Sequence, residues 1–244
     1  FRMNQTLARK NKQLKRLNDD LDNFIYTVSH DLRAPINNIE ALLIDLFDTI
    51  PHTVRAEEEV KMLGNMISES VKRFRKIIKE LTEIAKSESE EISDIEEVAF
   101  SEIYNEVVEV LKDNIRQARG VIKCDFSLCP TVLFSRKNIR SILYNLMSNA
   151  IKYSSPDRTP QVLVKSDIDD EGEVILKVAD NGLGIKEADY DKVFEMFRRL
   201  HSHVEGSGIG MHLVKRIVDN AGGRIVIESE VGKGTTFIIY MGKE

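Results

Sequence analysis

The sequence has 244 residues, of which 42% are hydrophobic and 31% charged, and its formal net charge is -5. The length suggests one large or two ordinary domains, and the composition is typical of a soluble globular protein rich in helices. The negative charge argues against wholesale nucleic-acid binding, so we expect no nucleic-acid partner.

The chain contains no apolar run near the roughly 20 residues that cross a bilayer. Its two cysteines, Cys124 and Cys129, lack the spacing of a zinc site and indicate a reducing compartment. The first residue is Phe1 rather than Met. We therefore expect a cytoplasmic fragment of a longer protein, with a sensor domain upstream.

The first stretch follows a heptad pattern, in which apolar residues recur in steps of four and three over residues 3–28, with Lys10 as the polar exception. Neither Gly nor Pro interrupts the pattern before Pro35, so it predicts one long helix that ends near residue 49. Residues 1–23 are expected to form a coiled-coil signalling helix. Because such a helix cannot bury its seam alone, the pattern predicts a homodimer.

A second amphipathic helix follows a predicted turn at 50–57, and its apolar face carries Val60, Leu63, Ile67, Phe74, Ile77, Leu81 and Ile84. Two antiparallel helices from each of two chains would make a dimeric four-helix bundle over residues 24–88. Residues 89–97 are polar and acidic, and they are expected to form a linker.

His30 is singled out by its neighbours. Its heptad position places it outside the seam, where most histidines are simply solvated. Here Asp31 lies beside it, and Pro35 follows five residues later. A proline inside a helix costs about 3 kcal/mol and loosens the backbone, so a second domain could reach the imidazole.

From residue 98 to 244 the pattern changes to that of an α/β sandwich with a mixed sheet. Ser101 is expected to cap a helix that ends near Gln117. A second helix is predicted at 136–152, and a third runs from the second glycine cluster to about Ala221. Strands are predicted at 121–126, 131–134, 161–168, 173–179, 224–229 and 235–241.

Two glycine clusters lie in this half, at Asp180–Gly184 and Gly206–Gly210. Each alone could mark any tight turn, and neither has the spacing of a dinucleotide fingerprint or of a GxxxxGK[ST] loop. Glycines before a helix nevertheless expose backbone N–H groups, and a helix N-terminus favours anions. That combination suits a triphosphate.

The predicted helix at 136–152 carries Asn145, Asn149 and Lys152 at steps of four and three, so they share one face. Chance surface polarity is one interpretation. An oxygen ligand for Mg²⁺ beside a cation for phosphate explains the set better.

Five ordered motifs together resemble the HisKA-type sensor histidine kinases, over nearly the whole chain. They are the phosphoacceptor box at 29–35, the asparagine box NLMSNAIKY at 145–153, the first glycine box DNGLGI at 180–185, the phenylalanine box with Phe194 and Phe197, and the second glycine box GSGIGMHL at 206–213. The resemblance implies a dimerisation and phosphotransfer bundle followed by a GHKL, or Bergerat-type, ATP-binding domain. The implied function is autophosphorylation of His30 by ATP and transfer of the phosphoryl group to an aspartate on a response regulator's receiver domain.

The resemblance also assigns roles on the phosphate side of the nucleotide. Asn149 is expected to hold Mg²⁺ against the phosphates, with Asn145 and Lys152 helping to bind metal and phosphate. Residues 186–207 would form a lid from which Arg198 or Arg199 reaches the phosphates. The lid's far end would be positioned by Gly208 and Gly210.

On the base side, the resemblance implies that Asp180 accepts a hydrogen bond from the adenine amino group and that Tyr153 packs near the ring. Gly182 and Gly184 would let the backbone approach the nucleotide, and Ile185 would complete the contact.

The chemistry is compatible with these roles, because a free histidine with a pKa of about 6.5 is mostly neutral at pH 7 and therefore nucleophilic. Asp31 could hold the proton of one ring nitrogen and leave the other lone pair for the γ-phosphate. Related ATPases carry a water-activating Glu at the position of Asn145, and an amide cannot serve as that base. A plain ATPase and a non-catalytic relay remain the alternatives.

Ala34 departs from the family pattern, since many of these kinases have Thr or Asn four residues after the phosphohistidine. A methyl group cannot orient water, so we expect weak phosphatase activity toward the receiver.

Overall fold

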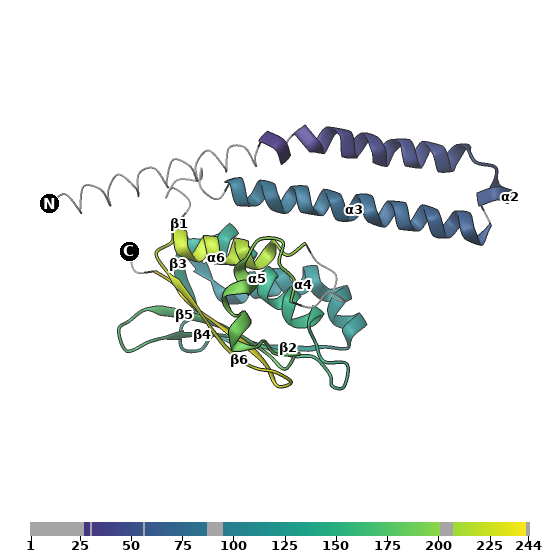
Figure 1. Ribbon diagram of the computed structural model, residues 1–244. Coiled ribbons are helices and arrows are strands. Elements are labelled where there is room, and N and C mark those ends of the chain that lie inside the picture. Colours follow the sequence, from purple (N-terminus) through teal and green to yellow (C-terminus); the bar gives the residue numbers. More distant parts are fainter. Residues whose placement is uncertain (1–26, 30, 56, 87–94, 201–206, 243–244) are drawn as a thin grey trace. The chain divides into compact units, whose positions relative to one another are not determined.

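The chain divides into two compact units, Phe1–Ser89 and Glu90–Glu244. In this computed structural model (Figure 1), the described residues are 27–29, 31–55, 57–86, 95–200 and 207–242. No helix within these ranges is long and apolar enough to cross a membrane.

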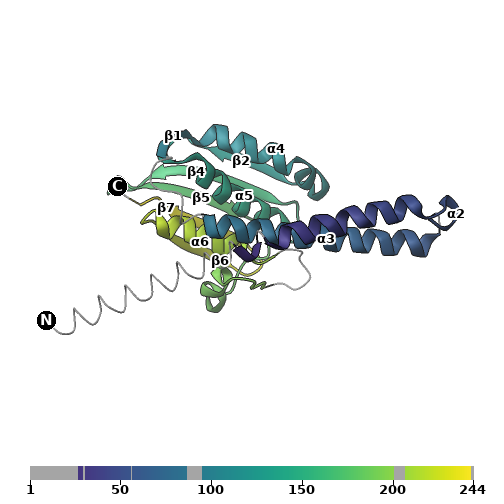
Figure 2. The same cartoon turned by 90° about the horizontal axis from the view of Figure 1, so that it is seen from above.

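The first unit is a helical hairpin. Residues 27–29 and 31–49 are helical, a four-residue helix α2 (His52–Arg55) occupies the connection, and α3 (Glu58–Lys86) runs back beside the first helix (Figures 1 and 2). The turn closes where the N–H groups of Val54 and Arg55 both donate to the Pro51 carbonyl at 3.0 Å. The helical hairpin and its turn at 50–57 were therefore predicted correctly.

The inner face of this hairpin is narrow. Ile36, Val71 and Ile78 are buried, and Leu32 and Leu43 pack against them. An ion pair of 2.7 Å between Arg75 and Glu40 lies at its exposed margin. Six other apolar side chains at helical spacing are between 41% and 58% exposed; we call them the hairpin seam: Ile39, Leu42, Leu46, Leu63, Ile67 and Phe74.

The second unit is built on a five-stranded sheet in the order β2-β4-β5-β7-β6. Only β2 and β4 pair in parallel and the other neighbours are antiparallel, so the predicted mixed sheet is confirmed. The strands are β2 (Val121–Asp125), β4 (Gln161–Ile168), β5 (Val174–Asp180), β6 (Arg224–Glu230) and β7 (Gly234–Tyr240). A separate antiparallel pair joins β1 (Ile95–Ala99) to β3 (Thr131–Ser135).

Three helices cover one face of the sheet: α4 (Phe100–Ala118), α5 (Arg136–Lys152) and α6 (Gly210–Asn220) (Figures 1 and 2). Strand β4 has one buried face and one exposed face. Val162, Val164 and Ser166 are buried and the residues between them are exposed, as expected where helices cover only one side of a sheet. Helix α5 lies at the centre of this core, and five of its side chains are at most 1% exposed: Ile139, Ile142, Leu143, Leu146 and Met147.

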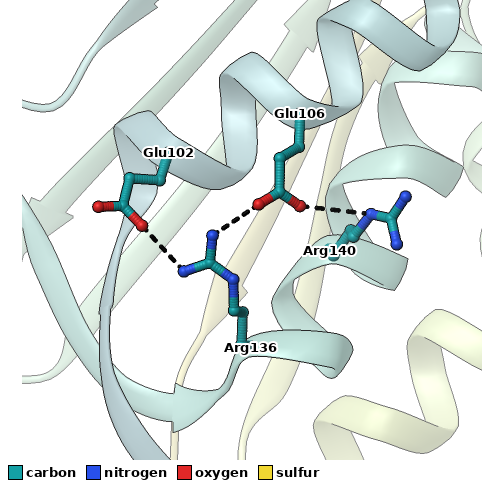
Figure 3. A network of polar contacts seen from close by, with 4 residues as sticks. All are labelled: Glu102, Glu106, Arg136 and Arg140. Atoms are coloured by element: carbon teal, nitrogen blue, oxygen red, sulfur yellow. Dashed lines mark hydrogen bonds and ion pairs between the residues drawn. The ribbon is translucent and has the colours of Figure 1, made fainter.

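An ion-pair network holds the first turn of α5 to α4 (Figure 3). The guanidinium of Arg136 donates to Glu102 at 2.9 Å and to Glu106 at 2.6 Å, and Arg140 lies 3.5 Å from the second oxygen of Glu106. The two carboxylates raise the pKa of Arg136, so the guanidinium stays charged. Because the network is exposed, it contributes little stability, but it fixes the register of the helix that carries the asparagine box.

Two predictions at the start of this unit are wrong. Ser101 does not cap α4, because the helix already begins at Phe100. The N-cap is Ala99, without a side-chain hydrogen bond, and the N–H of Phe100 donates to the Pro130 carbonyl at 3.1 Å. The linker predicted at 89–97 is also too long, since β1 begins at Ile95. The rest of that linker and the coiled coil predicted at 1–23 lie outside the described residues.

Candidate functional site

The polar residues of α5 face the start of α6. Asn145, Asn149 and Lys152 are half-buried, and the amide of Asn145 donates to the Ser141 carbonyl at 2.8 Å. A Cβ atom at Gly210 would overlap Oδ1 of Asn145, so the start of α6 lies directly against the Asn145 side chain. The asparagine box and the second glycine box are therefore brought together.

Asp180 is the last residue of β5 and lies at the carboxyl end of that strand. Its Oδ1 accepts from the N–H of Gly182 at 2.7 Å and from the N–H of Thr235 at 3.2 Å. Burial raises the pKa of Asp180, against the opposing effects of these hydrogen bonds and of the charge on Arg158. Since both hydrogen bonds end on Oδ1, Oδ2 is the oxygen that a ligand would approach.

The first glycine box is pressed against two other segments. A Cβ atom on Gly182 would lie 2.5 Å from the Tyr153 carbonyl oxygen, and one on Gly184, whose φ is +72°, would overlap the Glu230 carbonyl. The N–H of Leu183 donates to the Tyr153 carbonyl at 2.9 Å. The end of the asparagine box and the start of the β6–β7 turn therefore enclose a loop with little side-chain bulk.

Tyr153 lies at the C-cap of α5 and is half-buried. Burial raises the pKa of its hydroxyl, and the nearby positive charge of Arg199 acts in the opposite direction. Arg199 is thus close enough to act on the asparagine box. Arg198 is exposed and lies 3.7 Å from the carboxylate of Glu195.

The segment predicted as a lid begins with two short 3-10 helices, η2 (Glu187–Asp189) and η3 (Asp191–Phe194). The middle of the segment is joined to the residue that follows it, because the N–H of Phe197 donates to the Gly208 carbonyl at 3.0 Å. Gly208 has a φ of +73°, and a Cβ atom there would lie 2.7 Å from the Phe197 carbonyl carbon. Residues 201–206 lie outside the described residues.

The phenylalanine box has two different environments. Phe197 is 57% exposed and has a φ of 62°, which a bulky side chain rarely adopts. Phe194 is half-buried, and its carbonyl lies 3.0 Å from Nδ1 of His212 on α6. That contact ties the 3-10 helix η3 to the helix behind the second glycine box.

Two residues that the sequence analysis did not single out hold the other end of this segment. The hydroxyl of Tyr190 donates to the Ser229 carbonyl at 3.0 Å and accepts from the Ser229 N–H at 3.1 Å. The hydroxyl of Ser229 in turn accepts from the N–H of Ile185 at 2.8 Å. Their partners lie 39 and 44 positions away, so no local pattern in the sequence could have revealed them.

The comparison with protein families agrees with this geometry. The family described as Histidine kinase-, DNA gyrase B-, and HSP90-like ATPase matches residues 135–244, and the His Kinase A (phospho-acceptor) domain matches residues 20–90. The chain belongs to the sensor histidine kinases. It carries the two modules of their catalytic core, as the motifs predicted.

Relatives of the kinase match both modules. Methanogenesis regulatory histidine kinase FilI of Methanothrix harundinacea is 31% identical over 92% of this chain and 25% of its own length. Aerobic respiration control sensor protein ArcB of Escherichia coli is 32% identical over 93% of this chain and 29% of its own length. The kinase chain thus spans between a quarter and a third of these relatives.

A solved structure has the same fold. Full-length ShkA, solved in complex with AMPPNP, superposes with a TM-score of 0.72 at 23% identity over 90% of this chain and 46% of its own. The helical hairpin followed by an α/β sheet domain is therefore a fold that solved kinases share.

The residues expected to lie near the phosphates would suit a magnesium ion with few protein ligands. Among the described residues, no three His, Cys, Asp or Glu side chains are grouped as a metal site. Mg²⁺ usually keeps several waters and takes oxygens from substrate phosphates, so one amide oxygen such as that of Asn149 is a sufficient protein contribution. The Asn149 side chain is half-buried, which fits a group that is both held in place and open to a ligand.

His30 itself lies outside the described residues, although residues 27–29 and 31–49 on either side are helical. Asp31 is exposed, and so is Ala34. Pro35 is accommodated within this helix, where it has no N–H to donate to the Asp31 carbonyl.

Proposed function

We propose that this chain is the catalytic core of a two-component sensor kinase, which uses ATP to phosphorylate His30 and then passes the phosphoryl group to an aspartate on a receiver domain. The observation that carries the proposal is a half-buried carboxylate beside bare backbone, Asp180–Gly184, in the same chain as a histidine box. The first feature binds a purine nucleotide, and the second supplies the acceptor. We place this core in the cytoplasm, where ATP and receiver domains are found.

Asp180 would recognise the adenine. Its Oδ1 accepts hydrogen bonds from two backbone N–H groups, so the carboxylate cannot rotate freely. Oδ2 would then accept a hydrogen bond from the amino group of the base. Gly182 and Gly184 let this loop pack against the carbonyls of Tyr153 and Glu230, where a Cβ atom would not fit, and so fix the backbone beside the base. Tyr153 and Ile185 border the same loop and would contact the ring.

The phosphates would lie between α5 and the segment 186–207. Lys152 and Arg199 would supply positive charge, with Arg198 available from the same segment. Asn149, with Asn145 behind it, would hold Mg²⁺. When bound, this ion neutralises phosphate charge. Gly208 and Gly210 shape the start of α6, whose N-terminal N–H groups favour an anion.

At His30, the lone pair of one neutral ring nitrogen would form a bond to the γ-phosphorus. The bond from that phosphorus to the bridging oxygen breaks, and ADP leaves with the electron pair. Asp31 would hold the proton of the other ring nitrogen, which orients the imidazole and stabilises its developing charge. Transfer to the receiver repeats the displacement, with a carboxylate as the attacking group and neutral imidazole as the leaving group.

The hairpin seam supports a homodimer. Six large apolar side chains that are 41–58% exposed would cost free energy in water, since each buried apolar side chain contributes about 1.5–3 kcal/mol. A second copy of the hairpin would cover them and complete a four-helix bundle. The upstream sensor domain would act on this bundle through residues 1–23.

The test is incubation of the protein with γ-labelled ATP and Mg²⁺, followed by measurement of protein-bound label. We expect acid-labile, base-stable label on the wild type and none on His30→Gln. His52→Gln is the matched control, because His52 lies in the same hairpin at its far turn and should be labelled normally.

Three outcomes would contradict the proposal. Label on His30→Gln equal to that on the wild type would mean another acceptor. Steady release of phosphate without any bound label would point to an ATPase, and nucleotide binding without either would point to a relay.

A further inference from the structure

Arg158 lies outside all five sequence motifs. It lies between α5 and β4, and its Nη2 donates to the Gly182 carbonyl at 2.7 Å and to the Gly232 carbonyl at 2.6 Å. Its two acceptors are 24 and 74 residues away along the chain. One side chain therefore joins the first glycine box to the β6–β7 turn.

Each of the two peptide units that flank Gly182 is held by its own hydrogen bond. Its N–H donates to Oδ1 of Asp180, and its carbonyl accepts from Arg158. The β6–β7 turn is tied to the same loop a second time, because the N–H of Gly232 donates to the Leu183 carbonyl at 2.7 Å. Rotation of the peptide unit that contains the Gly182 carbonyl would break the bond to Arg158 and the bond that the N–H of Leu183, in the same unit, donates to the Tyr153 carbonyl. The Cα atom of Gly182 joins this unit to the one whose N–H fixes the carboxylate.

We propose that Arg158 is a positioning residue for the nucleotide: its guanidinium fixes the first glycine box so that the carboxylate of Asp180 is held ready for the base. The inference rests on the proposed ATP binding and adds a residue to it. Arg158 itself contacts backbone carbonyls, so it acts through Asp180 and Gly182 rather than on the ligand.

The charge of Arg158 has a second effect on the same group. Burial raises the pKa of Asp180, and Arg158 is the charged side chain that opposes this shift, beside the backbone N–H groups of Gly182 and Thr235. An ionised carboxylate is the form that accepts a hydrogen bond from an amino group. Arg158 therefore both orients Asp180 and favours its ionised form.

Two substitutions separate these effects. Arg158→Lys keeps the positive charge but is shorter and lacks the planar guanidinium whose Nη2 donates to both carbonyls, and Arg158→Gln keeps an N–H donor but loses the charge. We expect the Kd for ATP to rise about tenfold in both variants, the effect of losing one charge-assisted hydrogen bond. Lys123→Gln, an exposed lysine on β2, removes the same charge as a control and should bind ATP like the wild type.

The pH profile of the Kd distinguishes positioning from simple destabilisation. In Arg158→Gln the pKa of Asp180 should rise, so ATP affinity should be lost at a higher pH than in the wild type, whereas Arg158→Lys should keep the wild-type midpoint. A merely structural role would lower the melting temperature of the variants and leave the Kd and the midpoint of the folded protein unchanged.

The outcomes are distinct. If the wild type binds ATP and both Arg158 variants bind it with the same Kd and the same pH midpoint, the inference is overturned. If the wild type itself binds no ATP, the proposed function fails first.

Discussion

The hairpin and the α/β domain differ in how far each completes its own core. In the hairpin, the buried apolar cluster among the described residues consists of Ile36, Val71 and Ile78, and the hairpin seam remains exposed. In the α/β domain, helix α5 alone buries five large side chains almost fully. The α/β domain therefore completes a core of its own, whereas the hairpin leaves an apolar seam exposed, which the proposed second copy would cover.

This contrast predicts that ligand binding and dimerisation can be removed separately. The largest effect should come from Asp180→Asn, which leaves the fold almost unchanged. The N–H groups of Gly182 and Thr235 need an acceptor, so the amide oxygen of the variant would take the place of Oδ1 and its NH₂ would face the adenine amino group. Two donors cannot pair, so we expect ATP affinity to fall at least about 100-fold, the cost of an unsatisfied buried polar group.

Calorimetric titration with ATP measures this loss, and sedimentation should show the same dimer as the wild type. Asp113→Asn, on the exposed side of α4, is the control and should bind normally. ATP binding that survives in Asp180→Asn would remove Asp180 from the site.

The reverse separation is expected from Leu63→Asp in the hairpin seam, where the side chain is 50% exposed in one chain. A carboxylate buried between two copies is costly, so the dimer dissociation constant should rise by at least about tenfold. Sedimentation at several concentrations measures it, and ATP affinity should not change. Asn65→Asp adds the same charge at an exposed polar position two residues away and should remain dimeric.

A smaller effect is expected when two glycines of the α/β domain are replaced by alanine. The pair compares the cost of a positive φ angle alone with the cost of a positive φ angle plus a steric clash. Gly184 and Gly172 have φ angles of +72° and +78°, but only Gly184 has backbone within reach of a Cβ atom. Gly184→Ala should lower the free energy of unfolding by about 2–3 kcal/mol, and Gly172→Ala by about 1 kcal/mol from the φ angle alone. Thermal unfolding of both variants compares them directly, and equal melting temperatures would contradict the close approach.

The raised pKa of Asp180 gives a pH dependence with a defined sign. Burial shifts this carboxyl upward, so on acidification it takes up a proton at a higher pH than an ordinary aspartate. The protonated form cannot accept from the base, and ATP affinity should therefore fall as the pH drops through this raised pKa. Titrations across the acidic range would measure it; affinity constant down to the usual pKa of aspartate would contradict the assignment.

The smallest effect is expected in the hairpin at Ala34. Ala34→Thr adds a hydroxyl at an exposed helical position four residues after His30, where it could orient water. Dephosphorylation of the phosphorylated receiver should become modestly faster, while labelling of His30 is retained. Release of phosphate from the receiver, with and without the variant, is the measurement.

The sequence predicted those elements whose periodicity is strong. Helix α5 and strand β4 have the predicted bounds, because helical spacing of apolar residues and strict alternation leave little ambiguity. Strand β1 was missed, since three of its five residues are exposed and two of them are glutamates in a run of acidic residues. Its strand conformation is imposed by pairing with β3, a contact that local composition does not show.

The site divides in the same way. Glycines and side chains such as Asn149 and Asp180 form short motifs and can be recognised locally. Arg158 binds carbonyls, which every residue carries, so nothing in the sequence marks its partners. The wrong cap at Ser101 has a similar cause, because α4 starts earlier, at Phe100, whose N–H donates to the Pro130 carbonyl far along the chain.

Strand β1 also decides where this domain can be cut out of the chain. A fragment that starts at Val98 would keep only the last two residues of β1 and leave most of β3 without its neighbour. Leu133 is already 60% exposed there, and an unpaired edge with apolar side chains is a template for aggregation. Expression of a well-behaved isolated domain therefore requires a fragment that begins at or before Ile95.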